Sequence, residues 1–111
     1  MPIRILVAED FDLLREDLCE TINAQADMQV VGAAASGAEI RRLAMETPFD
    51  LILMDVEMET VSAGIRATEY ILEQKPGSIV VFLTAHETDS MILTSMAAGA
   101  ADYIVKGCPD A

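Results

Sequence analysis

Short apolar runs alternate with segments of helical periodicity along this chain. The run Leu51–Met54 is unbroken and ends at Asp55. A continuous apolar run of this length is typical of a strand buried on both faces of a parallel sheet. Four further runs of this kind predict strands over residues 3–8, 29–34, 79–84 and 102–105.

Helices are predicted between these strands, over residues 11–22, 37–46, 65–75 and 90–98. In the first, Leu14, Leu18 and Ile22 recur every fourth residue and place apolar side chains on one helical face. Ser36 is predicted to cap the second, with Glu39 three residues on, as in a capping box.

The alternation of strands and helices predicts an α/β fold with a doubly wound, five-stranded parallel sheet. Right-handed crossovers leave few topologies. The flavodoxin-like order 2-1-3-4-5 is the common one, and it opens a crevice between strands 1 and 3. Only five residues follow Lys106, too few for another helix. We therefore expect residues 1–111 to be one domain whose last helix is missing from this chain.

Composition and charge narrow the functional classes. Of the 111 residues, 52% are hydrophobic and 23% charged, which indicates a globular chain. The net charge of −12 argues against nucleic-acid binding by this segment and is compatible with a divalent cation or a basic partner. No apolar run approaches the ~18 residues of a membrane span, and the start lacks a signal-peptide core, so we expect a cytoplasmic protein without membrane contact.

The strands end at polar residues: Glu9 and Asp10, then Asp55, Thr84 and Lys106. In the predicted order these ends meet at one edge of the sheet. Two carboxylates ~4 Å apart repel by about 4 kcal/mol at an effective dielectric near 20, so three of them favour a bound cation. Mg²⁺ suits carboxylate and carbonyl oxygens.

The other strand ends suit a phosphoryl group. Lys106 offers a point charge and Thr84 a hydroxyl donor, while an Asp carboxylate such as Asp55 can form an aspartyl-phosphate. Each residue also has a simpler explanation. Glu9 and Asp10 could favour a helix dipole, Thr84 could cap a helix, and Lys106 could lie on the surface. Their coincidence at four strand ends favours a shared site.

Four motifs contain these residues: Val-Ala-Glu-Asp (7–10), Leu-Met-Asp-Val-Glu-Met (53–58), Leu-Thr-Ala-His (83–86) and Ala-Gly-Ala-Ala-Asp-Tyr-Ile-Val-Lys (98–106). With them the chain resembles the receiver domain of a two-component response regulator over essentially its whole length. The resemblance implies that a sensor histidine kinase, or a small phosphodonor, phosphorylates Asp55.

The resemblance also implies roles for the neighbouring residues. Asp10, Asp55 and the Glu57 carbonyl would bind Mg²⁺ directly, and Glu9 would act through water. Thr84 and Lys106 would contact the phosphoryl oxygens. Thr84 and Tyr103 would form the switch pair that carries the signal to the face of the fourth helix and fifth strand. Tyr103 could otherwise be an aromatic residue at the rim of the core.

The sequence around Asp10-Phe11 and Asp102-Tyr103 is similar to that of the NarL/LuxR branch of response regulators. Regulators of this branch carry a C-terminal DNA-binding domain, which lies outside this chain. We therefore expect a phosphoacceptor switch, not an enzyme, that controls transcription through homodimerisation and an output domain. DNA would be contacted only through that domain.

Two departures from the family pattern keep alternatives open. Glu59 stands where the family usually has proline, and the loop at 59–64 is one residue longer than usual. A degenerate receiver that only binds a partner is therefore one alternative. A phosphatase of the haloacid dehalogenase type is another, although that class has Asp where this chain has Glu57. His86 is interpreted as a loop residue near the site.

Overall fold

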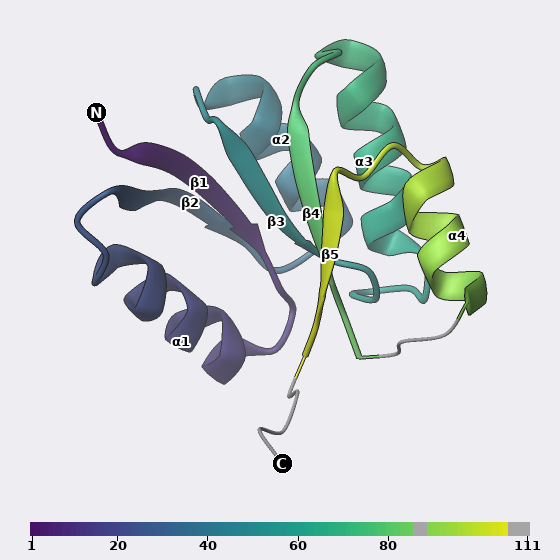
Figure 1. Cartoon of the computed structure of the whole chain (residues 1–111), viewed down its shortest axis with the longest axis horizontal. Coiled ribbons are helices and arrows are strands. Elements are labelled where there is room, and N and C mark those ends of the chain that lie inside the picture. Colours follow the sequence, from purple (N-terminus) through teal and green to yellow (C-terminus); the bar gives the residue numbers. More distant parts are fainter. Residues whose placement is uncertain (86–88, 107–111) are drawn as a thin grey trace.

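The computed structural model describes residues 1–85 and 89–106 and has the predicted order of elements (Figure 1). The elements in chain order are β1 (Ile3–Ala8), α1 (Asp12–Asn23), β2 (Met28–Ala34), α2 (Gly37–Glu46), β3 (Leu51–Asp55), α3 (Ala63–Gln74), β4 (Ile79–Thr84), α4 (Asp89–Ala97) and β5 (Asp102–Val105). The strands form one parallel sheet in the order β2-β1-β3-β4-β5. The predicted fold class and strand order are confirmed.

The bounds of β1, α2, β3, β4 and β5 are the predicted ones, and those of the other elements differ by one or two residues. The clearest difference is at α3, which begins at Ala63, so that Gly64 belongs to the helix and not to the preceding loop. The Gly64 amide donates to the Val56 carbonyl at 2.9 Å, which starts α3 directly against the end of β3. His86 lies outside the described residues.

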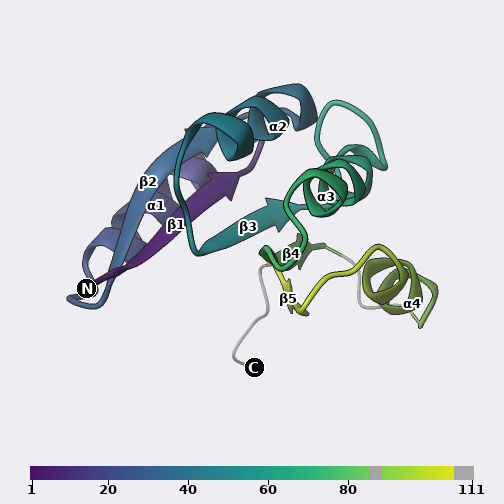
Figure 2. The same cartoon turned by 90° about the horizontal axis from the view of Figure 1, so that it is seen from above.

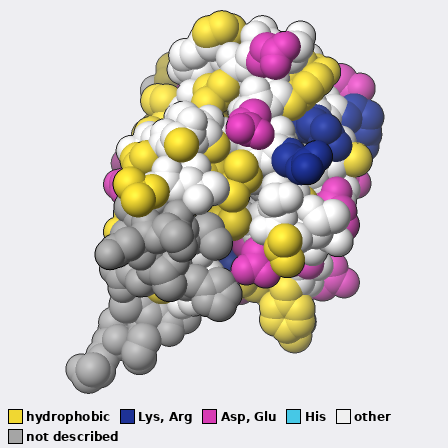
Figure 3. Space-filling view, turned by 90° about the vertical axis from the view of Figure 1, so that its right-hand side faces the viewer, with side chains coloured by type: hydrophobic (Ala, Val, Ile, Leu, Met, Phe, Trp, Pro, Cys, Tyr) yellow, Lys and Arg dark blue, Asp and Glu magenta, His cyan; other side chains and the backbone are white. Residues whose placement is uncertain are grey.

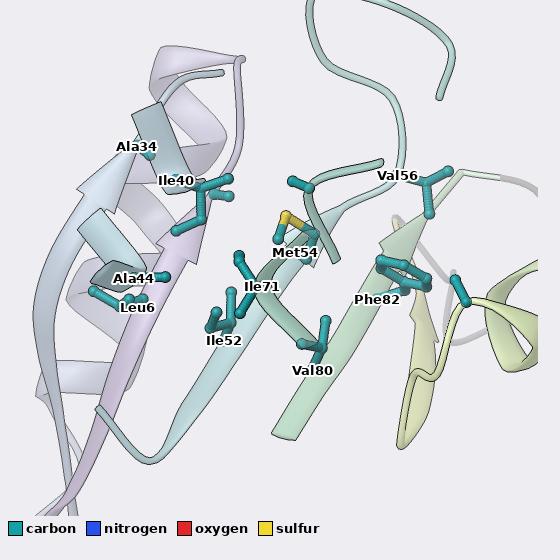
Figure 4. Packing of buried hydrophobic residues seen from close by; sticks show 13 residues of the cluster. Leu6, Ala34, Ile40, Ala44, Ile52, Met54, Val56, Ile71, Val80 and Phe82 are labelled. Carbon is teal, nitrogen blue, oxygen red and sulfur yellow. The ribbon is translucent and has the colours of Figure 1, made fainter. Parts of the chain in front are cut away.

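The larger core lies between the sheet and the helices α2 and α3. Seen from above, α2, α3 and α4 follow one another along the sheet (Figure 2). Figure 4 shows the buried side chains of this layer, most of which come from β1, β3 and β4 on one side and from α2 and α3 on the other. Leu6, Ile40, Ile52, Ile71 and Phe82 are all fully buried in it. Burying each such side chain stabilises the fold by about 1.5–3 kcal/mol.

The opposite face of the sheet is covered by α1. Leu18, Cys19 and Ile22 of this helix pack against a second, smaller cluster of buried strand residues. The four-residue spacing predicted this for Leu18 and Ile22, whereas Leu14 lines a groove next to β5. Helix α1 contacts β1 and β2 most extensively, so the β4–β5 end of this face is less covered. Ile104 of β5 is 51% exposed and lines the same groove beside α1. That a further helix covers this groove stays a prediction.

The first turn of α2 has the predicted cap. The Glu39 amide donates to Ser36 Oγ at 3.1 Å. In return Glu39 Oε1 accepts from the Ala35 amide at 2.7 Å, one residue earlier than in the standard capping box. Helix α2 is therefore fixed at the end that faces the loop after β3.

The surface reflects the acidic composition. On the face that carries α3 and α4, acidic side chains are scattered and the Lys and Arg side chains gather in one group (Figure 3). Within residues 1–85 and 89–106, every helix is too short or too polar to cross a membrane.

Gly64 is expected to be intolerant of a side chain. An added Cβ would overlap the Asp55 carbonyl oxygen and lie 2.9 Å from Val56 Cα, and backbone cannot move aside as a side chain can. We predict that Gly64→Ala lowers the free energy of unfolding by about 3 kcal/mol or more in urea titrations. Gly32→Ala is the control, because its Cβ would meet only side-chain ends of Leu6 and Leu43. An equal loss in the free energy of unfolding for the two variants would contradict this prediction.

Candidate functional site

The carboxyl ends of four strands meet at one edge of the sheet. In Figure 1, β1, β3, β4 and β5 all run toward the lower middle of the view. The pairing continues one residue beyond the strands, since the Val56 amide donates to the Leu83 carbonyl at 3.0 Å and the Lys106 amide to the Thr84 carbonyl at 2.6 Å. The regular ladder therefore brings the predicted polar strand ends to one level.

Three carboxylates share this edge. Glu9, Asp10 and Asp55 each offer one oxygen, and these oxygens all lie within 4.8 Å of one another. Glu9 is fully buried and Asp55 is 2% exposed, whereas Asp10 is open to solvent. The arrangement places two desolvated acids beneath one that a hydrated ion can reach.

Lys106 lies directly against the two buried acids. Its Nζ is 2.8 Å from Glu9 Oε1 and 2.9 Å from Asp55 Oδ2. The structure therefore rules out the simpler interpretation of Lys106 as an ordinary surface lysine. One ammonium faces three carboxylates, so the cluster keeps an excess of negative charge when all are ionised.

This imbalance sets the pKa of each group. Burial, with the neighbouring Glu9, raises the pKa of Asp55 to about 7 against the opposing effect of Lys106. Burial and Glu9 also raise the pKa of Asp10. Burial alone would raise the pKa of Glu9, but hydrogen bonds from Lys106 and the Phe11 amide outweigh it and lower that pKa. Burial opposes the charge on Lys106, yet its two carboxylate partners raise its pKa. Asp55 is the carboxylate least able to ionise without a further cation.

Contacts in the segment between β1 and α1 hold Glu9 in place. Glu9 Oε2 accepts from the Phe11 amide at 3.0 Å. Arg15 Nη1 donates to the Glu9 carbonyl at 2.9 Å, while its Nη2 lies 2.7 Å from Asp12 Oδ1. Arg15 was not predicted at this site, because the spacing of a helical arginine does not indicate that it folds back onto the preceding loop.

A cavity of about 360 Å³ opens over the acidic cluster. This volume is at the small end for ligand sites and fits an ion with a phosphoryl-sized group. The predicted residues Glu57, Thr84 and Lys106 line it, and Thr84 is buried. Phe11, Leu14, Val56 and Ala85 also line it.

Tyr103 lies apart from this cavity. Its side chain is partly buried and packs against the larger core, and its strand position is next to Phe82. The structure thus has Tyr103 in the place expected of an aromatic residue at the rim of the core. Its predicted role as a switch residue stays a prediction.

The donor set fits a hard divalent cation. All candidate ligands are oxygens, and Mg²⁺ is commonly bound by one or two carboxylates together with waters. The excess negative charge and the raised pKa of Asp55 are what a cation at this position would relieve. Asp10, Asp55 and the backbone of Glu57 are the groups that would hold it.

Known proteins resemble the chain over nearly its whole length. Residues 5–111 match the family of response regulator receiver domains. An uncharacterized transcriptional regulatory protein of Bacillus subtilis, YxjL, is 41% identical over 104 residues, which are 94% of this chain and 47% of the relative. The chain thus spans about half the length of the curated relatives that it matches.

Two solved structures have the same fold. The response regulator domain of Thermotoga maritima CheB is 34% identical, with a TM-score of 0.88 over 97% of this chain and 81% of that one. A two-component response regulator of the LuxR family from Aurantimonas sp. SI85-9A1 is 29% identical, with a TM-score of 0.90 over 96% of this chain and 76% of that one. Together with the acidic edge of the sheet, these matches confirm the resemblance found in the sequence: the chain belongs to the response regulator receiver domains and is similar to the NarL/LuxR-type regulators.

Proposed function

We propose that this domain is the phosphoacceptor of a phosphorelay and that Asp55 is the residue that is phosphorylated. The observation that supports this most is the position of Asp55, which is buried at the end of the central strand against Lys106 and beside two further acids. An Asp55 carboxylate oxygen would attack the phosphorus of a phosphohistidine on a sensor kinase. The P–O bond to Asp55 forms as the P–N bond to the histidine breaks, and the imidazole keeps that electron pair and gains a proton from solvent.

Each neighbouring group has a proposed part in this transfer. When bound, Mg²⁺ would neutralise charge on the transferred phosphoryl group. Asp10, Asp55 and the Glu57 carbonyl would hold the ion, with Glu9 acting through water. Lys106 would exchange its contact with Asp55 for a phosphoryl oxygen, and the Thr84 hydroxyl would donate to another. Because the residues are already gathered, the protein mainly positions the reacting groups.

We further propose that phosphorylation is read on the face formed by α4 and β5. Thr84 would move toward the phosphoryl group and Tyr103 would turn inward, which changes the surface that supports homodimerisation. Relatives such as YxjL and LiaR are named as transcriptional regulatory proteins. By analogy, an output domain outside this chain would bind DNA and control transcription, in the cytoplasm where a sensor kinase can reach it.

Phosphorylation of Asp55 is testable with a small phosphodonor. We predict that acetyl phosphate with Mg²⁺ adds the mass of one phosphoryl group to the wild type, and that beryllofluoride with Mg²⁺ shifts the wild type toward dimers. Asp55→Asn should show neither change, because its amide cannot form an acyl phosphate. Intact-protein mass spectrometry and size-exclusion chromatography with light scattering measure the two outcomes, and EDTA is the control for the metal. An unmodified wild type would instead favour a degenerate receiver.

The pKa of Asp55 predicts how stability depends on pH. Since this pKa is raised from 3.8 to about 7, the folded domain holds the proton more tightly than the unfolded chain. In EDTA, the contribution of Asp55 to the free energy of unfolding is fully present below pH 3.8 and is lost as the pH rises through about 7. Asp55→Asn removes the titrating carboxylate and leaves Lys106 paired with Glu9. We therefore expect the variant to be more stable than the wild type at pH 8 by roughly 2 kcal/mol, with a smaller gap at pH 5.

Urea unfolding at the two pH values measures this difference. Asp50→Asn is a suitable control, because Arg4 holds the pKa of that exposed carboxylate at about 2, so its titration lies below the range tested. The control should gain no stability at pH 8. A less stable Asp55→Asn variant at pH 8 would contradict the prediction.

Glu57 is predicted to affect the lifetime of the aspartyl-phosphate. Glu57 lines the cavity two residues after Asp55. We expect the water that attacks the phosphoryl group to approach past this side chain. A carboxylate there can accept a proton from that water, so Glu57→Ala should lengthen the lifetime severalfold. Loss of the acetyl-phosphate-derived label after removal of the donor gives the rate, and Glu57→Gln separates charge from size. An unchanged lifetime in Glu57→Ala would show that the idea is wrong.

A further inference from the structure

The carboxylate of Glu59 lies at the N-terminus of α2, far from it in sequence. Its Oε1 and Oε2 both accept from the Gly37 amide, at 2.7 and 2.9 Å. The first amides of a helix have no partner inside the helix, and a carboxylate at this end is favoured by the helix dipole. The loop after β3 thus supplies a cap to a neighbouring helix.

The caps of α2 are divided between two segments of the chain. Ser36 Oγ accepts from the Glu39 amide, so the local cap is already in use. The Glu59 carboxylate accepts from the Gly37 amide, to which Ser36 Oγ does not bond. Each of the two side chains can be removed while the other keeps its bond, and this makes their effects separable by mutation.

The absence of a side chain at Gly37 allows this contact. A Cβ there would lie 3.2 Å from Glu59 Oε2 and 3.2 Å from the Ala63 carbonyl oxygen. The first turn of α2 therefore approaches both the loop and the start of α3 closely. Residues 59 and 63 are held against one surface of α2.

The same loop carries Glu57, which lines the acidic cavity. Its ends are fixed by the Val56 amide on Leu83 and by the Gly64 amide on the Val56 carbonyl. Between these ends, the Met58 and Ala63 amides donate to the Thr60 carbonyl, which are bonds within the loop itself. The bond from the Gly37 amide to Glu59 joins the middle of this loop to the N-terminus of α2.

We propose that Glu59 is a positioning residue for the metal site: by capping α2, it holds the segment that contains Glu57 in place at the cavity. The inference rests on the proposed function, in which Glu57 contributes a ligand oxygen. Without the hydrogen bonds from the Gly37 amide to Glu59, the loop would occupy its ordered position for only part of the time. The apparent affinity for a ligand falls in proportion to that fraction.

The test compares two caps of the same helix. Isothermal titration calorimetry with Mg²⁺ alone, at constant ionic strength, gives the dissociation constant of the wild type, Glu59→Ala, Glu59→Gln and Ser36→Ala. Both alanine variants remove a cap and should lower the Tm by a few degrees. Only Glu59→Ala should weaken Mg²⁺ binding, about fivefold if its loop is ordered one-fifth of the time. Glu59→Gln keeps one acceptor oxygen and should lie between Glu59→Ala and the wild type.

A second measurement follows the loop without metal. Hydrogen exchange of the Met58 and Ala63 amides in EDTA should be faster in Glu59→Ala than in the wild type and unchanged in Ser36→Ala. A purely structural cap would give the two alanine variants the same behaviour in both measurements, and that result overturns the inference. So does unchanged Mg²⁺ affinity in Glu59→Ala. A wild type that binds no Mg²⁺ at millimolar concentration would refute the proposed function itself, and the inference with it.

Discussion

The contact of one ammonium with two buried carboxylates is the interaction on which this site depends. Lys106 compensates Glu9 and Asp55 only in part, because Asp10 adds a third negative charge at the same edge. Buried charges are costly unless they are paired, and here the cost appears as the raised pKa of Asp55. The site therefore keeps an excess of negative charge that a bound cation would offset, as the proposed function requires.

The parallel sheet makes this concentration of charge possible. Neighbouring strands keep their hydrogen-bond ladder to the last residue, and so four strand ends reach the same level without any special loop geometry. The large core behind the sheet, from Leu6 to Phe82, provides the stability that the charged edge lacks. The charged residues of the site therefore lie at the ends of the strands, and the apolar residues that stabilise the fold lie along the same strands.

The loops complete the site in two different ways. Arg15 reaches back from α1 to the loop after β1. Glu59 belongs to the loop after β3 and accepts from the Gly37 amide of α2, a helix on the opposite face of the sheet from α1. Where the family usually has proline, which restricts the backbone directly, this chain has a side chain that bonds to another element. The proposed function and the further inference meet at this loop, because it carries both Glu57 and Glu59.

The sequence by itself determined the strands, the helices and the strand order, because apolar periodicity, caps and crossover handedness are local or nearly local rules. It also determined which polar residues gather, since each of them ends or directly follows an apolar strand: Glu9, Asp10, Asp55, Thr84 and Lys106. The folded chain alone decided which of these charges pair and which stays in excess, because ion pairs depend on distances of a few ångströms between distant segments. The same reason explains why Arg15, Gly64 and the bond of Glu59 to α2 were not predicted. Their partners lie across a helix turn or a neighbouring element, and no spacing in a single sequence records such a contact.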